Sequence, residues 1–144
     1  MRMRWFVLAG GIILGILGFL RGELWEAGIS FCTGLAGGFA LDLLGVEILK
    51  LWYYPRQPFP SKLYFLITLP SWGVFGAAVN LTWNSMGSMS LFVSSTTIII
   101  GLLLFHEVPN LKTKSWVYRT PSWVVILGWI PLITFFRMLY VFLT

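Results

Sequence analysis

The sequence is poor in the residues that most catalytic and metal-binding sites use. Its 144 residues include one cysteine, Cys32, and one histidine, His106. A single thiol cannot form an intramolecular disulfide, and one cysteine with one histidine cannot complete a tetrahedral zinc site. No phosphate-binding loop or nucleophile motif of the usual spacing occurs in the chain. The sequence therefore predicts no metal site and no cofactor, and it disfavours the usual soluble-enzyme chemistries.

Charged residues are also scarce. They make up 10% of the chain, against 58% hydrophobic residues, and the mean hydropathy is +0.84. A soluble domain could not cover so much apolar surface with polar atoms. The apolar residues come in runs of about 20, the length that crosses a hydrocarbon core about 30 Å thick. The sequence predicts an all-α integral membrane protein.

The apolar runs predict five transmembrane helices in one domain that covers residues 1–144. The expected helices cover about residues 5–20, 25–49, 63–83, 88–108 and 123–142. The first run follows two arginines, as a secretory signal would, but no small-x-small cleavage site comes after it. We therefore expect it to be a retained helix.

Lysine and arginine predict the orientation of these helices. Eight of them precede the first run or lie in the second and fourth connections, at Arg2, Arg4, Lys50, Arg56, Lys62, Lys112, Lys114 and Arg119. Only Arg21 lies in a connection on the opposite side. The positive-inside rule then predicts a multi-pass cell-membrane protein with a cytoplasmic N-terminus and an external C-terminus. Because the basic residues lie in short loops, the net charge of +5 does not indicate a nucleic acid partner.

Glycines spaced four residues apart recur in the first two expected helices. The pairs are Gly11 and Gly15, Gly18 and Gly22, and Gly34 and Gly38. Such spacing lines small residues along one helix face and lets a neighbouring backbone approach closely. We expect these faces to pack the first two helices together. Docking of a second copy, as in a homo-oligomer, or of a larger membrane partner stays open as the alternative.

Two segments of the chain present the same residue types in the same order. They are "ALDLLGVEILKLWYYP", residues 40–55, and "LFHEVPNLKTKSWVYRTP", residues 104–121. Each contains an acid followed by a W-x-Y motif: Asp42 with Trp52 and Tyr54, and Glu107 with Trp116 and Tyr118. The order predicts a parallel two-helix repeat, the second and third expected helices matching the fourth and fifth. Chance similarity is the alternative, because interfacial loops commonly collect these residue types.

Asp42 is the most costly of the acids to bury. It lies about 10 Å from the end of its expected helix, at 1.5 Å per residue, which is too deep for a short side chain to reach water. An acid at that depth costs about 3 kcal/mol, so it is expected to face the bundle, paired or protonated. Hydrogen bonds from Asn80 or Thr82 would be the structural alternative to a functional role.

The other charged residues in or near the spans have simpler interpretations. Glu107 lies nearer the interface, beside His106, with which it could form an acid/base pair. Glu47 is expected to pair with Lys50, three positions further along the same helix face. Arg137 is expected to reach outward to the acids at the outer ends of the first two helices, Glu23 and Glu26.

The repeated motif resembles the membrane repeats of carotenoid enzymes of the lycopene cyclase and bisanhydrobacterioruberin hydratase type. The residues that carry the resemblance are Asp42, Gly45, Val46, Trp52, Tyr54, Pro70 and Trp72, with Glu107, Trp116 and Tyr118 as the second copy. The resemblance implies a helical membrane scaffold and an isoprenoid substrate. The chain lacks the Pro-x-Glu-Glu motif whose acids would protonate the polyene in the cyclases. The resemblance therefore implies the scaffold rather than cyclase activity.

These observations predict an intramembrane acidic site for an apolar, isoprenoid-like or lipid ligand, on which acid-catalysed chemistry could take place. Asp42 and Glu107 are the candidate catalytic residues. The candidate ligand-binding residues are Asn80, His106, Trp52, Tyr54, Trp116 and Tyr118. A proton-linked transporter or channel and a non-catalytic assembly subunit are the alternatives, and the sequence leaves open whether the protein is an enzyme.

Overall fold

The computed structural model describes residues 2–86 and 91–144. The chain is mostly helical, so the predicted all-α class is confirmed. The α-helices are α1 (Arg2–Arg21), α2 (Leu24–Asp42), α3 (Leu69–Ser85), α4 (Leu91–Leu102), α5 (Val108–Thr113) and α6 (Ser122–Leu143). Three π-helical turns, η1 (Leu43–Ile48), η2 (Tyr64–Thr68) and η3 (Leu103–Glu107), extend α2, α3 and α4. Two short strands are β1 (Trp52–Tyr53) and β2 (Val117–Tyr118).

Each expected membrane span coincides with one helix or with a continuous run of helices, although residues 88–90 of the fourth span lie outside the described residues. By length and composition, the segments Leu24–Ile48 and Tyr64–Ser85 are long and apolar enough to cross a membrane. Ala9–Arg21 and Leu127–Leu143 are shorter apolar helices. The membrane location and the number of five spans stay predictions.

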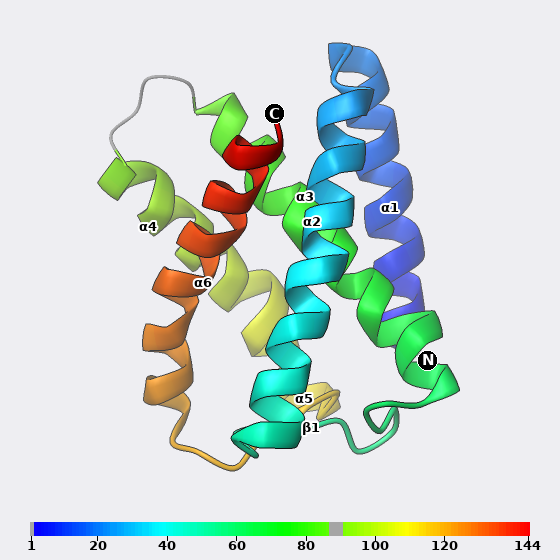
Figure 1. Ribbon diagram of the computed structural model, residues 1–144, viewed down its shortest axis with the longest axis vertical. Helices are drawn as coiled ribbons and strands as arrows, with labels where there is room; N and C mark the ends of the chain where they lie inside the picture. The colour runs from blue at the N-terminus through cyan, green and yellow to red at the C-terminus, as the bar shows by residue number, and fades with distance from the viewer. Residues whose placement is uncertain (1, 87–90) are drawn as a thin grey trace.

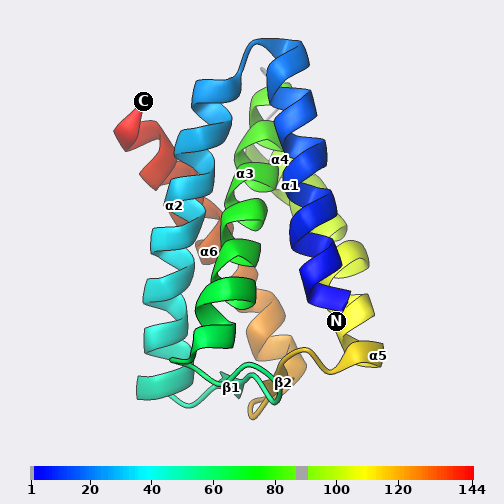
Figure 2. The same cartoon turned by 90° about the vertical axis from the view of Figure 1, so that its right-hand side faces the viewer.

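The long helices form a bundle with the strands at one end. Figure 1 shows α2 in the centre, with α1 on one side of it and α6 on the other, and the C-terminus at the end opposite the strands. Figure 2, turned by 90°, shows α3 between α1 and α2, and β1 beside β2 below the bundle. The two expected cytoplasmic connections therefore lie side by side.

Helices α2 and α3 approach each other closely through glycines. A Cβ added at Gly34 would overlap the backbone of Trp72 and Gly73, and one at Gly76 would lie 2.6 Å from the Cα of Gly34. A Cβ at Gly38 would overlap the Trp72 side chain. The pair Gly34 and Gly38 was predicted to pack the first two helices together, but it packs α2 against α3 instead.

The glycines of α1 behave differently from those of α2. A Cβ at Gly18 would lie 3.3 Å from Ala27, so this position does bring α1 against α2. Gly22 has a φ of +69° and forms the turn between the two helices, where a side chain would be strained. Added Cβ atoms at Gly11 and Gly15 would meet nothing within 4 Å. The predicted contact between α1 and α2 thus holds only near their connection.

A cluster of aromatic and branched side chains forms the core between α3, α4 and α6. Its buried members are Trp72, Phe75, Val79, Ile98, Trp129, Ile133 and Phe136. The rings of Trp72 and Phe75 meet edge to face with centroids 5.5 Å apart, and Phe75 meets Trp129 at the same distance. These contacts join the two expected repeats through their apolar faces.

The two W-x-Y motifs pair with each other as an antiparallel ribbon. Trp52 lies opposite Tyr118, and Tyr53 lies opposite Val117. Tyr53 and Val117 are the middle residues of the two motifs, so the pairing is centred on equivalent positions. A two-fold axis through the ribbon requires this register, because it exchanges each strand for the other.

The backbone conformation just before the ribbon supports the same relation. Lys50 and Lys114 each precede the tryptophan of their motif by two residues. Both have left-handed backbone conformations, with φ values of 53° and 49°. Such values are uncommon outside glycine, and they occur here at matching positions. Sequence order, backbone conformation and strand register together favour the predicted duplication over chance.

Candidate functional site

The carboxyl group of Asp42 is surrounded by four hydrogen-bond donors. The Trp52 Nε1 and the Tyr54 hydroxyl donate to Oδ1 at 3.1 and 2.8 Å. The Tyr64 hydroxyl and the Trp72 Nε1 donate to Oδ2 at 2.8 and 2.7 Å. Asp42 has no solvent exposure, so these donors replace the water that a carboxylate would otherwise bind.

Three segments deliver these donors to the end of a fourth, α2. Asp42 ends α2, and the strand alternation of β1 places Trp52 and the following Tyr54 on the same face of the ribbon. Tyr64 begins η2, and Trp72 lies one turn into α3. The carboxyl group therefore ties the end of α2 to the ribbon and to the start of the following helix.

Gly45 makes room for this arrangement. It lies in η1, one turn after Asp42, and an added Cβ would overlap the ring of Trp52. The six-membered ring of the indole therefore approaches the backbone of η1 closely while its N–H donates to Asp42. Glycine is required here because of this close approach, not because of its backbone angles.

The geometry suits Asp42 as a hydrogen-bond acceptor. Two of its four partners are indoles, which can donate but cannot accept. Each carboxylate oxygen has one indole and one phenol, so an ionised carboxylate satisfies all four donors. The predicted partners Asn80 and Thr82 are wrong: the Asn80 amide donates to the Gly76 carbonyl at 3.2 Å, and Thr82 is exposed.

Glu107 and the second W-x-Y motif form a related cluster. The Tyr118 hydroxyl donates to Glu107 Oε1 at 2.7 Å and accepts from the Trp116 Nε1 at 2.8 Å. The Asn110 side chain holds the Trp116 backbone, accepting from its N–H at 3.1 Å and donating to its carbonyl at 3.0 Å. Glu107 is half-buried, whereas Asp42 is fully buried. The side chain of His106, the predicted partner of Glu107, lies outside the described residues.

Both ribbon tyrosines stay protonated over a wide pH range. Burial raises the pKa of Tyr54 well above its usual value, and the nearby Asp42 charge raises it further. Burial also raises the pKa of Tyr118, with a further contribution from its hydrogen bond to Glu107. Each phenol is therefore a hydrogen-bond donor to its acid at neutral pH.

An apolar cavity of about 220 Å³ lies between the two clusters. Its wall includes the aromatic residues Trp52, Tyr54, Trp72, Trp116, Tyr118 and Trp129. Neither Asp42 nor Glu107 lines it, but each accepts a hydrogen bond from a tyrosine that does. The two acids thus hold side chains of the cavity wall in position without contacting the cavity themselves.

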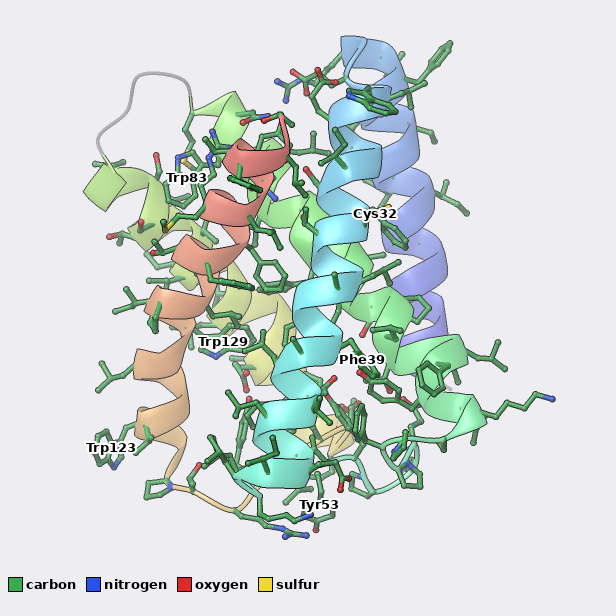
Figure 3. The ribbon with its side chains drawn as sticks, in the orientation of Figure 1. Cys32, Phe39, Tyr53, Trp83, Trp123 and Trp129 are labelled. Carbon is green, nitrogen blue, oxygen red and sulfur yellow. The ribbon has the colours of Figure 1, made fainter. Side chains whose placement is uncertain are left out.

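The cavity reaches the surface between η1 and α6. Leu44 of η1, Leu49 just after η1, and Val124 and Gly128 of α6 line it and are exposed. Figure 3 shows Trp129 directed from α6 toward the interior of the bundle, whereas Trp123, one and a half turns earlier, points away from it. The cavity therefore has an aromatic interior and an aliphatic mouth on the side of the bundle.

The outer face of the ribbon carries charge. Tyr53 and Arg119 alternate with the cavity-lining residues, and the Arg119 guanidinium lies 5.1 Å from the centre of the Tyr53 ring. The predicted pair of Glu47 and Lys50 is confirmed, with a 3.5 Å distance between Oε2 and Nζ on the exposed surface. The ribbon therefore separates a basic end from the apolar cavity.

The predicted contact of Arg137 with the acids of the first two helices is wrong. Arg137 donates to the Asn84 Oδ1 at 2.7 Å, and its guanidinium lies over the rings of Trp83 and Tyr140. Glu23 instead pairs with Arg21 at 2.8 Å. Arg137 is positioned by α3 and by its own helix, because α6 packs beside α3 at this end.

The structure brings four of the predicted ligand-binding residues to the cavity, with Asp42 and Glu107 behind its wall. Trp52, Tyr54, Trp116 and Tyr118 line the cavity, whereas Asn80 does not. The residues that sequence reasoning missed as site members include Tyr64, Phe75, Thr120, Gly128 and Trp129. Trp129 shares a Pro-and-Trp helix pattern with Trp72, and that repeat signal could have identified it. Tyr64 has no counterpart in the second copy, so no repeat signal was available for it.

No protein-family model matches the chain, and neither the curated proteins nor the solved structures contain a significant match. The resemblance to the membrane repeats of carotenoid enzymes therefore stays a prediction.

Proposed function

We propose that this chain is a multi-pass protein of the cell membrane that binds one end of an apolar, isoprenoid-like or lipid molecule in the cavity between its two repeats. The cavity itself carries this proposal: its aromatic interior opens through an aliphatic mouth on the side of the bundle. In the proposed orientation the N-terminus and the ribbon face the cytoplasm, and the C-terminus lies outside.

The size of the cavity limits what it can hold. A cavity of about 150 Å³ in another protein accepts benzene. The 220 Å³ found here would accept a methyl-substituted ring or a short branched chain end, but not a whole long-chain lipid. The remainder of such a molecule would leave through the mouth between η1 and α6 and lie in the surrounding lipid.

The position of the mouth favours entry from the membrane. Leu44 and Leu49 on one side, and Val124 on the other, present aliphatic side chains next to the opening. The charged residues nearby, such as Lys50 and Arg119, belong to the outer end of the ribbon rather than to the mouth. An apolar ligand could therefore enter laterally without crossing a charged surface.

The two acids have different roles in this proposal. Asp42 is a positioning residue, because three of its four hydrogen bonds fix Trp52, Tyr54 and Trp72 in the cavity wall. Glu107 connects to the cavity through Tyr118, so any proton exchange with the ligand is assigned to that pair. Whether chemistry follows binding is a separate question from whether binding occurs.

The test uses a substitution that blocks the opening of the cavity and leaves the fold intact. An added Cβ at Gly128 meets nothing within 4 Å, so Gly128→Leu should fold while its side chain blocks the cavity. Gly101→Leu is the matched control, since Gly101 also has free space on a helix and does not line the cavity. The measurement is mass spectrometry of the molecules that co-purify with each protein in mild detergent.

We expect one apolar species to be enriched in the wild type and in Gly101→Leu and to be lost from Gly128→Leu. The same bulk lipids in all three preparations would contradict the proposal. In that case, proton or solute flux in liposomes would be measured next, since a transporter is the alternative that uses the same acids.

A further inference from the structure

We propose that Arg137 binds the phosphate group of a membrane phospholipid at the end of the bundle opposite the ribbon. The inference rests on the membrane location given in the proposed function, but it does not depend on the cavity or on the ligand assigned to it. In the proposed orientation this end of the bundle faces outward, so the phosphate belongs to a lipid of the outer leaflet.

Arg137 carries a charge that no ion pair balances. The chain has five acids, all of them among the described residues: Glu23, Glu26, Asp42, Glu47 and Glu107. Two of these acids form ion pairs, each with a basic residue close to it in the sequence. None of the five lies within ion-pair distance of the Arg137 guanidinium. A charge within a membrane span is costly when it is unpaired, so Arg137 is a candidate for binding an anion from outside the chain.

Two aromatic rings and one amide hold the guanidinium in place. Its central carbon lies 5.6 Å from the centre of the Trp83 ring and 5.1 Å from the centre of the Tyr140 ring. Its Nη1 donates to the Asn84 Oδ1 at 2.7 Å, and the Asn84 Nδ2 donates in turn to the Tyr140 hydroxyl at 3.2 Å. These connected contacts fix the orientation of the guanidinium before any anion binds.

Most of the hydrogen-bond donors of this guanidinium remain available. An arginine side chain has five N–H donors arranged as a planar fork. Within the part of the chain that the structure describes, Asn84 supplies its one acceptor. Arg137 is half-buried, so its side chain can still be reached from the surface. The free donors suit a phosphate, whose oxygens can accept two parallel N–H bonds from one guanidinium.

The surroundings favour a lipid phosphate over a phosphate ion from solution. Next to Arg137, α6 presents the exposed apolar side chains of Met138 and Val141, which suit contact with acyl chains. Figure 3 shows Trp83 beside the last turns of α6. Trp83 and Tyr140 both lie near helix ends, where aromatic residues of membrane proteins meet the lipid headgroups. The guanidinium is therefore held at the depth of the lipid phosphates.

The experiment compares two lipids with the same acyl chains: dioleoylphosphatidylglycerol, which has a phosphate, and monogalactosyl dioleoylglycerol, which has none. Each is titrated into the purified full-length protein in maltoside detergent, and native mass spectrometry counts the lipid molecules bound. Basic residues at the ribbon end can bind further phospholipid, so the decisive quantity is the number lost on substitution. We expect Arg137→Gln to lose one phospholipid molecule, which the wild type binds about tenfold more tightly than the galactolipid, the effect of one charge-assisted hydrogen bond.

Two further variants separate binding from packing. Arg21→Gln is the matched control, because Arg21 lies at the same end of the bundle and already bonds to Glu23 and Ser85. It should bind as many phospholipid molecules as the wild type. Arg137→Lys keeps the charge but loses the fork, so its affinity at this site should lie between those of the wild type and Arg137→Gln. Circular dichroism checks the folding of each variant, and if Arg137→Gln does not fold, the affinity of Arg137→Lys must still fall below that of the wild type.

The results that would overturn the assignment are specific. Equal phospholipid counts in the wild type, Arg21→Gln and Arg137→Gln would do so, and so would equal binding of the two lipids at the site lost in Arg137→Gln. Displacement of this phospholipid by inorganic phosphate would show that the site takes a free anion and would overturn the choice of a lipid. None of these results concerns the cavity, which Gly128→Leu tests separately, so a failure here is distinguishable from a failure of the proposed function.

Discussion

The two halves of this molecule contain the same acid and aromatic motif in different surroundings. In the first half, Asp42 is completely buried and accepts four hydrogen bonds, two on each oxygen. In the second half, Glu107 is half-buried and accepts from the Tyr118 hydroxyl, which in turn accepts from the Trp116 indole. The same motif thus encloses its acid completely in one copy and leaves it partly exposed in the other.

The lengths of the two connections account for this difference. Residues 54–63 lie between β1 and η2, and this longer connection allows Tyr64 to reach Asp42 at the start of the next helix. Only residues 119–121 lie between β2 and α6, so the chain enters the helix at once and supplies no tyrosine there. The first acid is therefore enclosed by its own repeat, whereas the second is left beside the cavity.

The largest difference is expected when each acid is converted to its amide. In Asp42→Asn, the amide nitrogen would face an indole N–H that cannot accept, so we expect a loss of about 3 kcal/mol in the free energy of unfolding. In Glu107→Gln, the remaining carbonyl can still accept from Tyr118, and the expected loss is about 1 kcal/mol. Denaturant unfolding in detergent micelles, followed by circular dichroism, measures both. Equal losses of stability would contradict the proposal that the two acids differ in their structural importance.

The second difference concerns helix packing. Gly34→Ala places a Cβ against the backbone of α3, and overpacking of this kind costs about 1–3 kcal/mol. Gly101→Ala, on α4 of the second half, meets nothing and should be stabilising by about 0.5–1 kcal/mol through its higher helix propensity. The midpoints of thermal unfolding for the two variants should therefore move in opposite directions. A destabilised Gly101→Ala protein would show that α4 packs more closely than the structure indicates.

The smallest effect is a pH dependence at the alkaline end. An unfolded tyrosine ionises near pH 10.0, whereas burial raises the native pKa of Tyr54 and Tyr118 above that value. Their contribution to stability is therefore complete below pH 10 and is lost as the pH rises further, because the unfolded state releases protons that the native state retains. We expect the unfolding temperature to decline above pH 10, with a shallower slope in Tyr118→Phe. An unchanged slope would indicate that Tyr118 ionises in the native state as readily as in the unfolded state.

Much of the helical organisation could be predicted from the sequence, because the apolar runs and their polar connections are local features. The W-x-Y motifs were also recognisable, since alternate residues of a short extended segment share one face. In the structure, Trp52, Tyr54, Trp116 and Tyr118 of these motifs line one cavity.

The partners of the buried and charged side chains could not be predicted in the same way. Asp42 was expected to bond Asn80 or Thr82, two polar residues of the next span, but indole and phenol groups from three segments reach it instead. Arg137 was assigned to the acids at the outer ends of the first two helices, whereas the packing of α6 beside α3 gives it Asn84 and two aromatic rings. Such contacts depend on how each helix is rotated about its axis and on which helix packs beside it. No local pattern in a single sequence shows either.

The most direct test of the account is to locate a bound ligand by photo-crosslinking. An isoprenoid probe with a diazirine at one end would be irradiated with the protein in nanodiscs, and the modified residues would be identified by mass spectrometry. We predict labelling of cavity residues such as Leu44, Trp129 and Leu132, and its loss in Gly128→Leu but not in Gly101→Leu. Labelling confined to the exposed faces of α1 and α2, equal in all three proteins, would contradict a ligand site between the two repeats.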